Sequence, residues 1–388
     1  MKSRMKILLV SSGSGSRGGG EIFLNYLGGA LAARGHAVTT WMPAHARMDE
    51  LAAQCARFSE VVRTEFANTY DHRSRSLATM FNARASDAVA RQWAALQPDI
   101  IHVNKQNLED GLDLLRAARL SGRPSVCTIH LTQTARYLRA RGALLRDLVA
   151  WWELRKFAGG FVAVQDTRRD ELSSFLGSDA RTRTIFNGVP PIDSGETAAL
   201  RDAMRAELNI ADGQLLIVGV GRLVPQKRPF VFLDVARQLH RQHPQARFVW
   251  VGDGELAAAW RAAVAGHGLS GVVSCVGWQS DVRPYLSAAD LLLHTAEFEG
   301  LPFALIEAMS MAVPCAISKT VAAELPFLDA GNAIVYDEPG RLERLVACPQ
   351  ALREVGEAAR ALMHERFSDH AMAASYEALY TGQMASGR

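Results

Sequence analysis

Two glutamates, Glu299 and Glu307, are the residues of this sequence whose type and spacing could best do chemistry. Seven residues separate them. The short apolar run 291–293 before them is typical of a buried parallel strand, and the helix-forming residues after Pro302 can follow a proline in the first helical position. The pattern therefore predicts a strand, a loop that holds Glu299, a helix that holds Glu307, and a second strand at 313–317.

This arrangement would suit a ligand that carries both hydroxyl groups and a phosphate. The two carboxylates could accept hydrogen bonds from hydroxyls, and the loop would place backbone amides at the helix N-terminus, where an anion is favoured. The loop residues concerned are Gly300, Leu301, Pro302 and Phe303, of which Pro302 has no N–H to donate. The alternative is that the glutamates supply negative charge near a helix start and lie on a solvated face.

A second set of charges lies earlier in the chain, where Arg222 and Lys227 flank a turn. The apolar run 215–220 before them predicts a strand, and a helix is expected to follow them. One forked guanidinium and one point charge, on a loop that can close, are suited to hold a diphosphate. Two surface cations with no ligand are the alternative.

A glycine-rich loop follows the first predicted strand, at 6–11. It contains a literal G-x-G-x-x-G, formed by Gly13, Gly15 and Gly18. A dinucleotide site would also need an acidic residue at the end of the second strand, but residues 39–43 hold none. We therefore interpret Gly18, Gly19 and Gly20 as a loop that lets the backbone approach a phosphate or a sugar closely, with a flexible turn as the alternative.

The elements that must position these residues alternate between strands and helices, which predicts an α/β fold. Strands are predicted at 6–11, 37–41, 60–63, 98–103, 124–129, 161–164 and 182–186, and again at 215–220, 248–252, 272–276, 291–293 and 313–317. The predicted helices include one that follows the glycine-rich loop and ends at about Ala33, and the segments 76–96, 107–120, 134–157 and 369–380. His130 follows the strand at 124–129, where a lone histidine is either structural or part of a site.

The composition is typical of a globular protein and limits the classes of function that are possible. The 388 residues suit two domains, with 48% hydrophobic and 21% charged residues. A net charge of +3 is too small to indicate nucleic acid. Five scattered cysteines without a CxxC pair suit a reducing cytoplasm. No cluster of metal ligands, no signal peptide and no run long enough to span a membrane is expected.

The predicted helix at 134–157 is unusually basic and also holds Trp151 and Trp152. A basic helix with aromatic side chains can lie on an anionic membrane surface, which would make the protein peripheral at the inner membrane face. The alternative, which we favour on the sequence alone, is a solvated face with buried tryptophans.

Several strings together resemble the retaining glycosyltransferases of family 4, which have the GT-B fold. The residues FEGLP at 298–302 and LIEAM at 305–309 are similar to the family's Glu-x7-Glu signature. The other matching strings are GGGE at 18–21, RGHAV at 34–38, GRLVPQK at 221–227, VGDGEL at 251–256 and GWQSD at 277–281. Arg228 stands where the family usually has glycine, and His294-Thr295 stands where it usually has Pro-Ser.

The resemblance implies two Rossmann-like lobes that face each other across a cleft. Residues 1–188, with a C-terminal helix at 369–388 packed back on them, would form the acceptor-side lobe, and residues 189–368 the nucleotide-sugar lobe. The reaction would move a sugar, without a metal or cofactor, from a nucleoside diphosphate sugar (UDP or GDP) to a hydroxyl of a lipid-linked sugar, a glycan or a small metabolite. A GT-B sugar-nucleotide epimerase or hydrolase, and a catalytically silent partner protein, are the alternatives.

The resemblance also implies roles for individual residues. Arg222 and Lys227 would bind the diphosphate and stabilise it as it leaves, Glu307 would bind the ribose, and Glu299 would hold the donor sugar. Gly18–Gly20 and His130 would complete the site, Trp278 and Asp281 would lie in the loop that binds the base, and Gly300–Phe303 would contact the donor. The absence of a DxD motif agrees with a site in which cations, and not a metal, hold the diphosphate.

Overall fold

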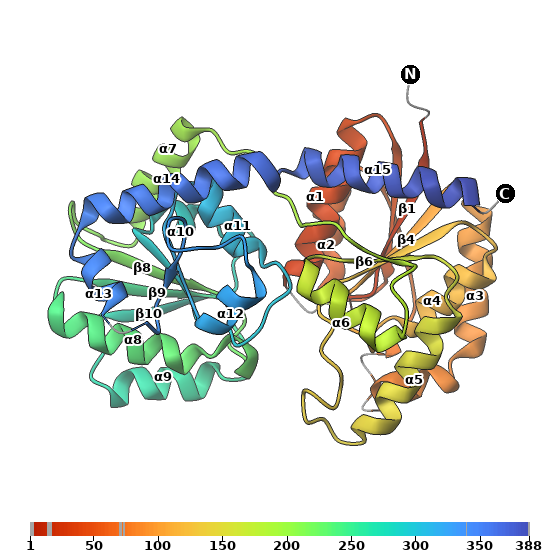
Figure 1. Ribbon diagram of the computed structural model, residues 1–388, viewed down its shortest axis with the longest axis horizontal. Helices are drawn as coiled ribbons and strands as arrows, with labels where there is room; N and C mark the ends of the chain where they lie inside the picture. Colours follow the sequence, from red (N-terminus) through yellow and green to blue (C-terminus); the bar gives the residue numbers. More distant parts are fainter. Residues whose placement is uncertain (1–3, 14–17, 70–71, 73, 339, 387–388) are drawn as a thin grey trace. The chain divides into compact units, whose positions relative to one another are not determined.

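The computed structural model describes residues 4–13, 18–69, 72, 74–338 and 340–386. The chain divides into two compact units, Met1–Gly188 with Asp369–Arg388, and Val189–Ser368 (Figure 1). Gly15, the second glycine of the G-x-G-x-x-G pattern, lies outside the described residues.

The first unit is built from strands that alternate with helices. Its strands are β1 (Lys6–Ser11), β2 (Ala37–Pro43), β3 (Glu60–Thr64), β4 (Ile100–Lys105), β5 (Ser125–Ile129), β6 (Gly160–Ala163) and β7 (Thr182–Thr184). Its helices are α1 (Gly19–Ala33), α2 (Asp49–Cys55), α3 (Ala83–Ala95), α4 (Leu112–Leu120), α5 (Ala143–Lys156), α6 (Asp166–Leu176) and α15 (Asp369–Ser386), with 3₁₀ turns η1 (Ala46–Met48) and η3 (Arg75–Met80).

The second unit repeats this alternation. Its strands are β8 (Leu216–Val220), β9 (Arg247–Val251), β10 (Val273–Gly277), β11 (Leu291–His294), β12 (Cys315–Ile317) and β13 (Ile334–Val335). Its helices are α7 (Ser194–Glu207), α8 (Pro229–Gln242), α9 (Ala257–Gly266), α10 (Arg283–Ala288), α11 (Phe303–Ser310), α12 (Lys319–Glu324), α13 (Arg341–Val346) and α14 (Pro349–Arg366), with a 3₁₀ turn η4 (Pro225–Lys227).

Each unit contains a parallel sheet with helices on both faces, as in a Rossmann fold. The strand order is β3-β2-β1-β4-β5-β6-β7 in the first unit and β10-β9-β8-β11-β12-β13 in the second. Helices cover both faces, so the central strands are buried on both sides and read as continuous apolar runs. In each sheet the order reverses between the first strand of the unit and its neighbour, β4 or β11, and this is the switch point where ligands of such folds bind.

The hydrophobic cores fill the spaces between these sheets and their helices. In the first unit, Trp41 and Trp93 pack edge to face, with ring centroids 5.4 Å apart, in the core under α3 and α4. In the second unit, Phe232 of α8 packs on Trp250 of β9 at 5.3 Å. Large aromatic side chains of this kind bury most of the apolar area that stabilises a domain.

Three predicted helices are shorter in the structure, and hydrogen bonds to aspartate side chains explain two of them. The helix predicted at 107–120 begins at Leu112, because the Asp110 carboxylate accepts hydrogen bonds from the amides of Gln106 and Asn107, 3.0 Å each. The helix predicted at 134–157 begins at Ala143. The helix predicted at 76–96 is divided into η3 and α3 at Phe81–Asn82.

The beginning of the 134–157 segment shows how a distant side chain overrides helix propensity. The carboxylate of Asp147, on α5, accepts hydrogen bonds from the amides of Ala135 and Arg136 at 2.7 and 3.0 Å. These bonds hold residues 135–136 against the helix that they would otherwise have joined. Gly142 then adopts a left-handed conformation (φ 66°) immediately before α5.

Among the described residues, no helix combines the length and the apolar character that crossing a membrane requires. In the same residues, no group of three or more His, Cys, Asp and Glu side chains is placed to hold a metal ion.

Candidate active site

The candidate site lies at the carboxyl ends of β8 and β11, two neighbouring strands at the switch point of the second sheet. Leu291 pairs with Ile217, and Leu292 with Val218, so the two strands end side by side. Residues 221–228 follow β8 and residues 295–302 follow β11. The loops that carry Lys227 and Glu299 therefore begin at the same edge of the sheet.

Lys227 and Glu299 form a partly buried ion pair at this edge. The Lys227 ammonium donates a hydrogen bond to Oε1 of Glu299, whose side chain is 7% exposed. The Nε2 atom of His294, the last residue of β11, lies 3.3 Å from the same oxygen. Burial alone would raise the pKa of Glu299, but the Lys227 charge and the hydrogen bonds from His294 and Lys227 outweigh it and lower the pKa to about 2.

The two loops are joined by further hydrogen bonds that fix the pair. The Thr295 hydroxyl donates to the carbonyl oxygen of Lys227 at 2.8 Å. The Gln226 side chain donates to the carbonyl oxygen of Phe298 at 3.1 Å, and the Glu297 amide donates to the carbonyl oxygen of Gln226 at 2.9 Å. Because the backbones of both loops are held, the Lys227–Glu299 pair is preorganised.

Glycine is required where the loop after β8 passes close to its neighbours. Gly221 has φ 153°, and a Cβ atom there would lie 3.2 Å from the Lys227 side chain. Gly252, at the end of β9, has φ 135°, and a Cβ there would lie 2.1 Å from the Gly221 carbonyl oxygen. Side chains at these positions would displace the loop that presents Lys227.

Arg228, the residue that replaces the glycine of the family string, is in the left-handed region with φ 48° and ψ 53°. A non-glycine residue is strained there by about 1–2 kcal/mol. The turn therefore has the left-handed conformation that a glycine would adopt easily. The arginine is strained in it, directly beside Lys227.

The structure places the other predicted residues of this unit around the same loops. The Arg222 side chain is exposed, and no hydrogen bond or ion pair of its guanidinium is present within the part of the chain that the structure describes. Glu307 is 5% exposed on α11. Pro302 is the residue before the first helical residue, Phe303, so it caps α11 and does not begin it as predicted.

Trp278 and Asp281 lie in the loop after β10, two strands away from β8 in the sheet. Asp281 accepts hydrogen bonds from the Arg283 side chain at 2.7–3.1 Å, and these bonds, with the Arg283 charge, outweigh partial burial and lower the pKa of Asp281. Trp278 is half-buried.

In the first unit, His130 and Gly20 are connected through Asn104. His130 Nε2 lies 2.8 Å from the Asn104 side-chain oxygen, and the Asn104 side-chain amide donates to the Gly20 carbonyl oxygen at 2.8 Å. The amide oxygen can only accept, so His130 carries a proton on Nε2. Burial lowers the pKa of His130 to about 4, which keeps the imidazole neutral at pH 7 with Nδ1 as an acceptor.

Close packing explains one of the glycines that open α1, Gly20. A Cβ atom on Gly20 would lie 2.0 Å from the Gln106 side chain. Gly18 caps α1 with an extended backbone, and its carbonyl oxygen accepts from the Glu21 amide at 3.2 Å. Gly19 is the first residue of the helix and is exposed. The opening of α1 is therefore confined by Gln106 at the end of β4.

Two residues of the site were assigned no role from the sequence. His294 was noted only as a departure from a family string, and Glu324 was not singled out. In the structure, His294 is 2% exposed beside Glu299, and a Glu324 carboxylate oxygen accepts from the Glu299 amide at 3.1 Å. The position of His294 at the end of strand β11, next to the loop with Glu299, is the signal that could have identified it.

Two family descriptions match the chain, each over one of its halves. The family described as glycosyl transferases group 1 matches residues 201–361, and the family described as glycosyltransferase family 4 matches residues 17–192. The two matched ranges together include the Lys227–Glu299 pair and His130.

Two characterised relatives are similar over part of their length. A UDP-Gal:alpha-D-GlcNAc-diphosphoundecaprenol alpha-1,3-galactosyltransferase of Escherichia coli is 27% identical over 62% of this chain and 60% of its own. An alpha-D-kanosaminyltransferase of Streptomyces kanamyceticus is 23% identical over 65% of this chain and 68% of its own. The alignment thus leaves more than a third of the galactosyltransferase unmatched.

Solved structures match the fold over nearly the whole chain. HepE of Anabaena in complex with UDP-glucose has a TM-score of 0.78 at 20% identity and covers 99% of this chain and 100% of its own. Sucrose-phosphate synthase of Thermosynechococcus elongatus has a TM-score of 0.73 at 19% identity, with coverage of 99% and 100%. At these identities the likeness establishes the architecture.

Proposed function

Since this chain belongs to the group 1 glycosyl transferases, the GT-B enzymes of family 4, we propose that it transfers a sugar from a nucleoside diphosphate sugar to a hydroxyl acceptor with retention of anomeric configuration. The observation that carries the proposal is the preorganised Lys227–Glu299 pair at the switch point of the second sheet. A cation and an ionised carboxylate at that edge fit the two halves of such a donor, the diphosphate and the sugar hydroxyls.

In this proposal Lys227 and Arg222 stabilise the leaving diphosphate. Negative charge develops on the diphosphate as the glycosidic bond breaks, and fixed cations lower the energy of that state. The Lys227 ammonium has three N–H groups, so it can keep its bond to Glu299 and donate another to a phosphate oxygen. The exposed guanidinium of Arg222, on the same loop, adds a forked donor. These two cations supply the charge that a metal ion would otherwise provide.

Glu299 binds hydroxyls of the donor sugar in this scheme, and Glu307 accepts hydrogen bonds from the ribose hydroxyls. The low pKa of Glu299 keeps it ionised throughout the physiological range, so it acts as an acceptor and not as an acid. The backbone at Gly300–Phe303 and the loop with Trp278 and Asp281 contact the rest of the nucleotide. His130 and the Gly18–Gly20 loop are proposed to contact the donor sugar.

The donor base is proposed to be uracil or guanine, and the acceptor to be a glycan, a lipid-linked sugar or a small metabolite. The UDP-glucose complex of HepE and the diphosphoundecaprenol substrate in the name of the Escherichia coli relative support a nucleotide-sugar donor and a lipid-linked acceptor. Synthesis of a cell-surface polysaccharide or glycolipid is the corresponding role.

A panel of UDP and GDP sugars tests this function. We expect one donor class to raise the melting temperature of the wild-type protein, and Lys227→Ala to weaken that rise, because a ligand that binds the folded state stabilises it. The stabilising donor is then incubated with candidate acceptors in excess EDTA, and the anomeric configuration of the product is read by NMR. Transfer with retention in EDTA is expected.

Three results would contradict parts of the proposal. Free sugar formed at the same rate with and without acceptor would indicate a hydrolase. Loss of activity in EDTA that magnesium or manganese restores would exclude metal independence. Failure of every nucleoside diphosphate sugar to stabilise the protein would exclude the donor site itself.

A further inference from the structure

Large hydrophobic side chains are exposed on one part of the first unit. Across the described residues, ten large hydrophobic side chains are exposed, and eight of them lie in two short segments, 80–81 and 137–152. We call these eight residues the α5 face: Met80, Phe81, Tyr137, Leu138, Leu144, Leu145, Leu148 and Trp152. Single exposed hydrophobic residues are ordinary, whereas a gathering of this kind marks a surface that another phase or molecule covers.

The α5 helix turns its apolar stripe away from the protein. Leu144, Leu148 and Trp152 are spaced by four residues, and with Leu145 they fall within an arc of about 100° at 3.6 residues per turn. Leu144 is 73% exposed, Leu148 and Trp152 are each 56% exposed, and Leu145 is 54% exposed. A helix of a globular domain normally buries such a stripe. The inward side of α5 instead carries Ala150, Glu153 and Leu154.

The two segments of the α5 face are held together by polar contacts. The Ser76 hydroxyl of η3 donates to the carbonyl oxygen of Arg146 at 3.1 Å. Both residues also contact Glu109, whose carboxylate accepts from Arg146 at 2.6 and 2.8 Å and from Ser76 at 3.1 Å. The end of η3, with Met80 and Phe81, is thereby fixed beside α5, and the hydrophobic residues form one surface on a rigid base.

The exposed charges that the 134–157 segment itself contributes to the α5 face are of one sign. Exposed cationic side chains follow its length: Arg136, Arg139, Arg141, Arg155 and Lys156. The acidic residues of 134–157 are Asp147 and Glu153, and both are engaged within the protein. Asp147 accepts from the amides at 135–136, and Glu153, which is 8% exposed, pairs with Arg116 and Lys156.

We propose that the α5 face docks on an anionic lipid surface. Leucines flanked by a tryptophan and a tyrosine suit the boundary between headgroups and acyl chains, and the cations suit anionic headgroups. The cations at the end of α5 are already placed beside aromatic rings, with Lys156 Nζ 4.9 Å from the Trp152 ring and the Arg155 guanidinium 4.7 Å from the Trp151 ring. This docking goes beyond glycosyl transfer and does not depend on it, since it needs no donor.

Vesicle flotation with the full-length protein tests the proposal. We expect the protein to float with vesicles of phosphatidylcholine that contain 30% phosphatidylglycerol, and to stay behind with phosphatidylcholine alone at 0.1 M salt. The triple change Leu144→Ser, Leu148→Ser and Trp152→Ser should reduce binding by on the order of a hundredfold or more, because it removes three of the large apolar side chains that would enter the lipid. The matched control, Leu120→Ser with Phe230→Ser, removes exposed hydrophobic residues elsewhere and should bind as the wild type does.

A charge variant separates the two contributions. Arg136→Gln, Arg139→Gln and Arg141→Gln together should weaken binding to anionic vesicles by on the order of a hundredfold, because each cation near such a surface contributes severalfold. Changing Arg241, Arg261 and Arg353 to glutamine lowers the net charge equally and should have little effect. Binding should also weaken between 0.1 and 0.5 M salt.

Two outcomes would overturn the proposal. One is equal binding of the wild type and the Leu144, Leu148 and Trp152 variant to anionic vesicles. The other is a wild-type dimer in light scattering that the same variant converts to a monomer while neither form binds lipid, which would assign the α5 face to a second copy of the chain. Melting temperatures of all variants show whether they fold.

Discussion

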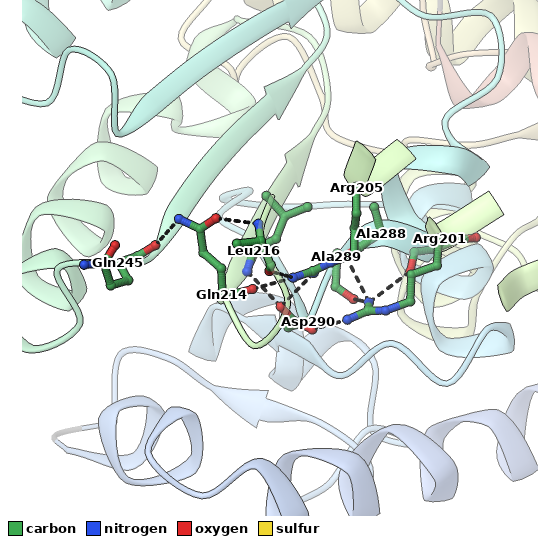
Figure 2. Close-up of polar contacts among 10 residues, drawn as sticks. Arg201, Arg205, Gln214, Leu216, Gln245, Ala288, Ala289 and Asp290 are labelled. Atoms are coloured by element: carbon green, nitrogen blue, oxygen red, sulfur yellow. Dashed lines mark hydrogen bonds and ion pairs between the residues drawn. The ribbon is translucent and has the colours of Figure 1, made fainter. Parts of the chain in front are cut away.

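The two ends of strands β8 and β11 each carry a carboxylate paired with basic side chains, but the two groups differ in what they hold. At the amino ends, Asp290 accepts from Arg201 at 2.5 Å, from Arg205 at 3.2 Å and from the Leu216 amide at 2.8 Å (Figure 2). At the carboxyl ends, Glu299 pairs with Lys227 and His294. Both sets connect loops of the same sheet, and the residue types alone do not distinguish them.

The partners of the cations make the distinction. Arg201 also donates to carbonyl oxygens at 287–289, and Arg205 donates to the carbonyl oxygens of Ala211 and Gln214, so both guanidiniums are engaged by the protein (Figure 2). Lys227 has donors left for a ligand beyond Glu299, and it lies at the switch point. The two groups lie at opposite edges of the same parallel sheet. The comparison teaches that this position, more than the presence of an ion pair, distinguishes a binding site from a structural network.

The largest effect is expected from Lys227→Ala. Turnover should fall by at least about a hundredfold, which corresponds to about 2.7 kcal/mol, because a fixed cation that stabilises the leaving group is lost. Arg241→Ala, which removes an exposed cation on α8, is the control and should leave turnover unchanged. If turnover of the Lys227 variant stays within a few-fold of the wild type, Lys227 has a structural role, like the arginines that bind Asp290.

The pH dependence of stability should report the Glu299 pair. Its pKa in the folded protein is about 2, below the ordinary 4.5, so the pair contributes stability that is present above pH 4.5 and is lost as the pH falls toward 2. The wild type should exceed Glu299→Gln in free energy of unfolding above pH 5. Urea denaturation at successive pH values should show this difference shrinking by about 1.4 kcal/mol per unit below pH 4.5. A difference independent of pH between 5 and 3 would contradict the pairing.

Asp290→Asn should lower the stability of the protein and leave its turnover nearly unchanged. The free energy of unfolding is expected to fall by about 2–3 kcal/mol, because two guanidiniums that are partly buried lose their carboxylate. Turnover of the folded variant should stay within a few-fold. The control is Asp234→Asn, which breaks an exposed pair with Arg237 and should cost under about 0.5 kcal/mol. A tenfold loss of turnover at unchanged stability would make the amino-end network functional.

The smallest effect is expected from Arg228→Gly. The substitution removes the strain of a left-handed arginine but adds backbone freedom to the unfolded chain, so the free energy of unfolding should change by no more than about 1 kcal/mol. Chemical denaturation measures it. A loss of 2 kcal/mol or more would show that the arginine side chain stabilises the turn and that strain is not its main effect.

Elements with local signals were predicted well from the sequence. The strand at 6–11 is confirmed, the helix predicted to end near Ala33 ends there, and the strand at 60–63 is extended by one residue. The signals for these elements, apolar runs and a glycine at a helix end, lie within the segments themselves. The same holds for the order of strand, loop, helix and strand from β11 to β12.

Features that depend on distant residues were not predicted. The start of α5 is set by Asp147 binding amides at 135–136, which no local propensity reveals. The contact of His294 with Glu299 depends on where β11 ends and on how the following loop returns. The exposed stripe of α5 was not predicted either: on the sequence we favoured a solvated face with buried tryptophans, whereas Trp152 is 56% exposed beside exposed leucines.

The central claim is that the carboxyl ends of β8 and β11 bind the diphosphate of a sugar donor. Isothermal titration calorimetry with UDP and GDP on the wild type, Lys227→Ala and Asp290→Asn tests it most directly. One nucleotide should bind the wild type and Asp290→Asn with similar affinity and bind Lys227→Ala at least about tenfold more weakly. Equal affinity of all three proteins for that nucleotide would contradict the claim.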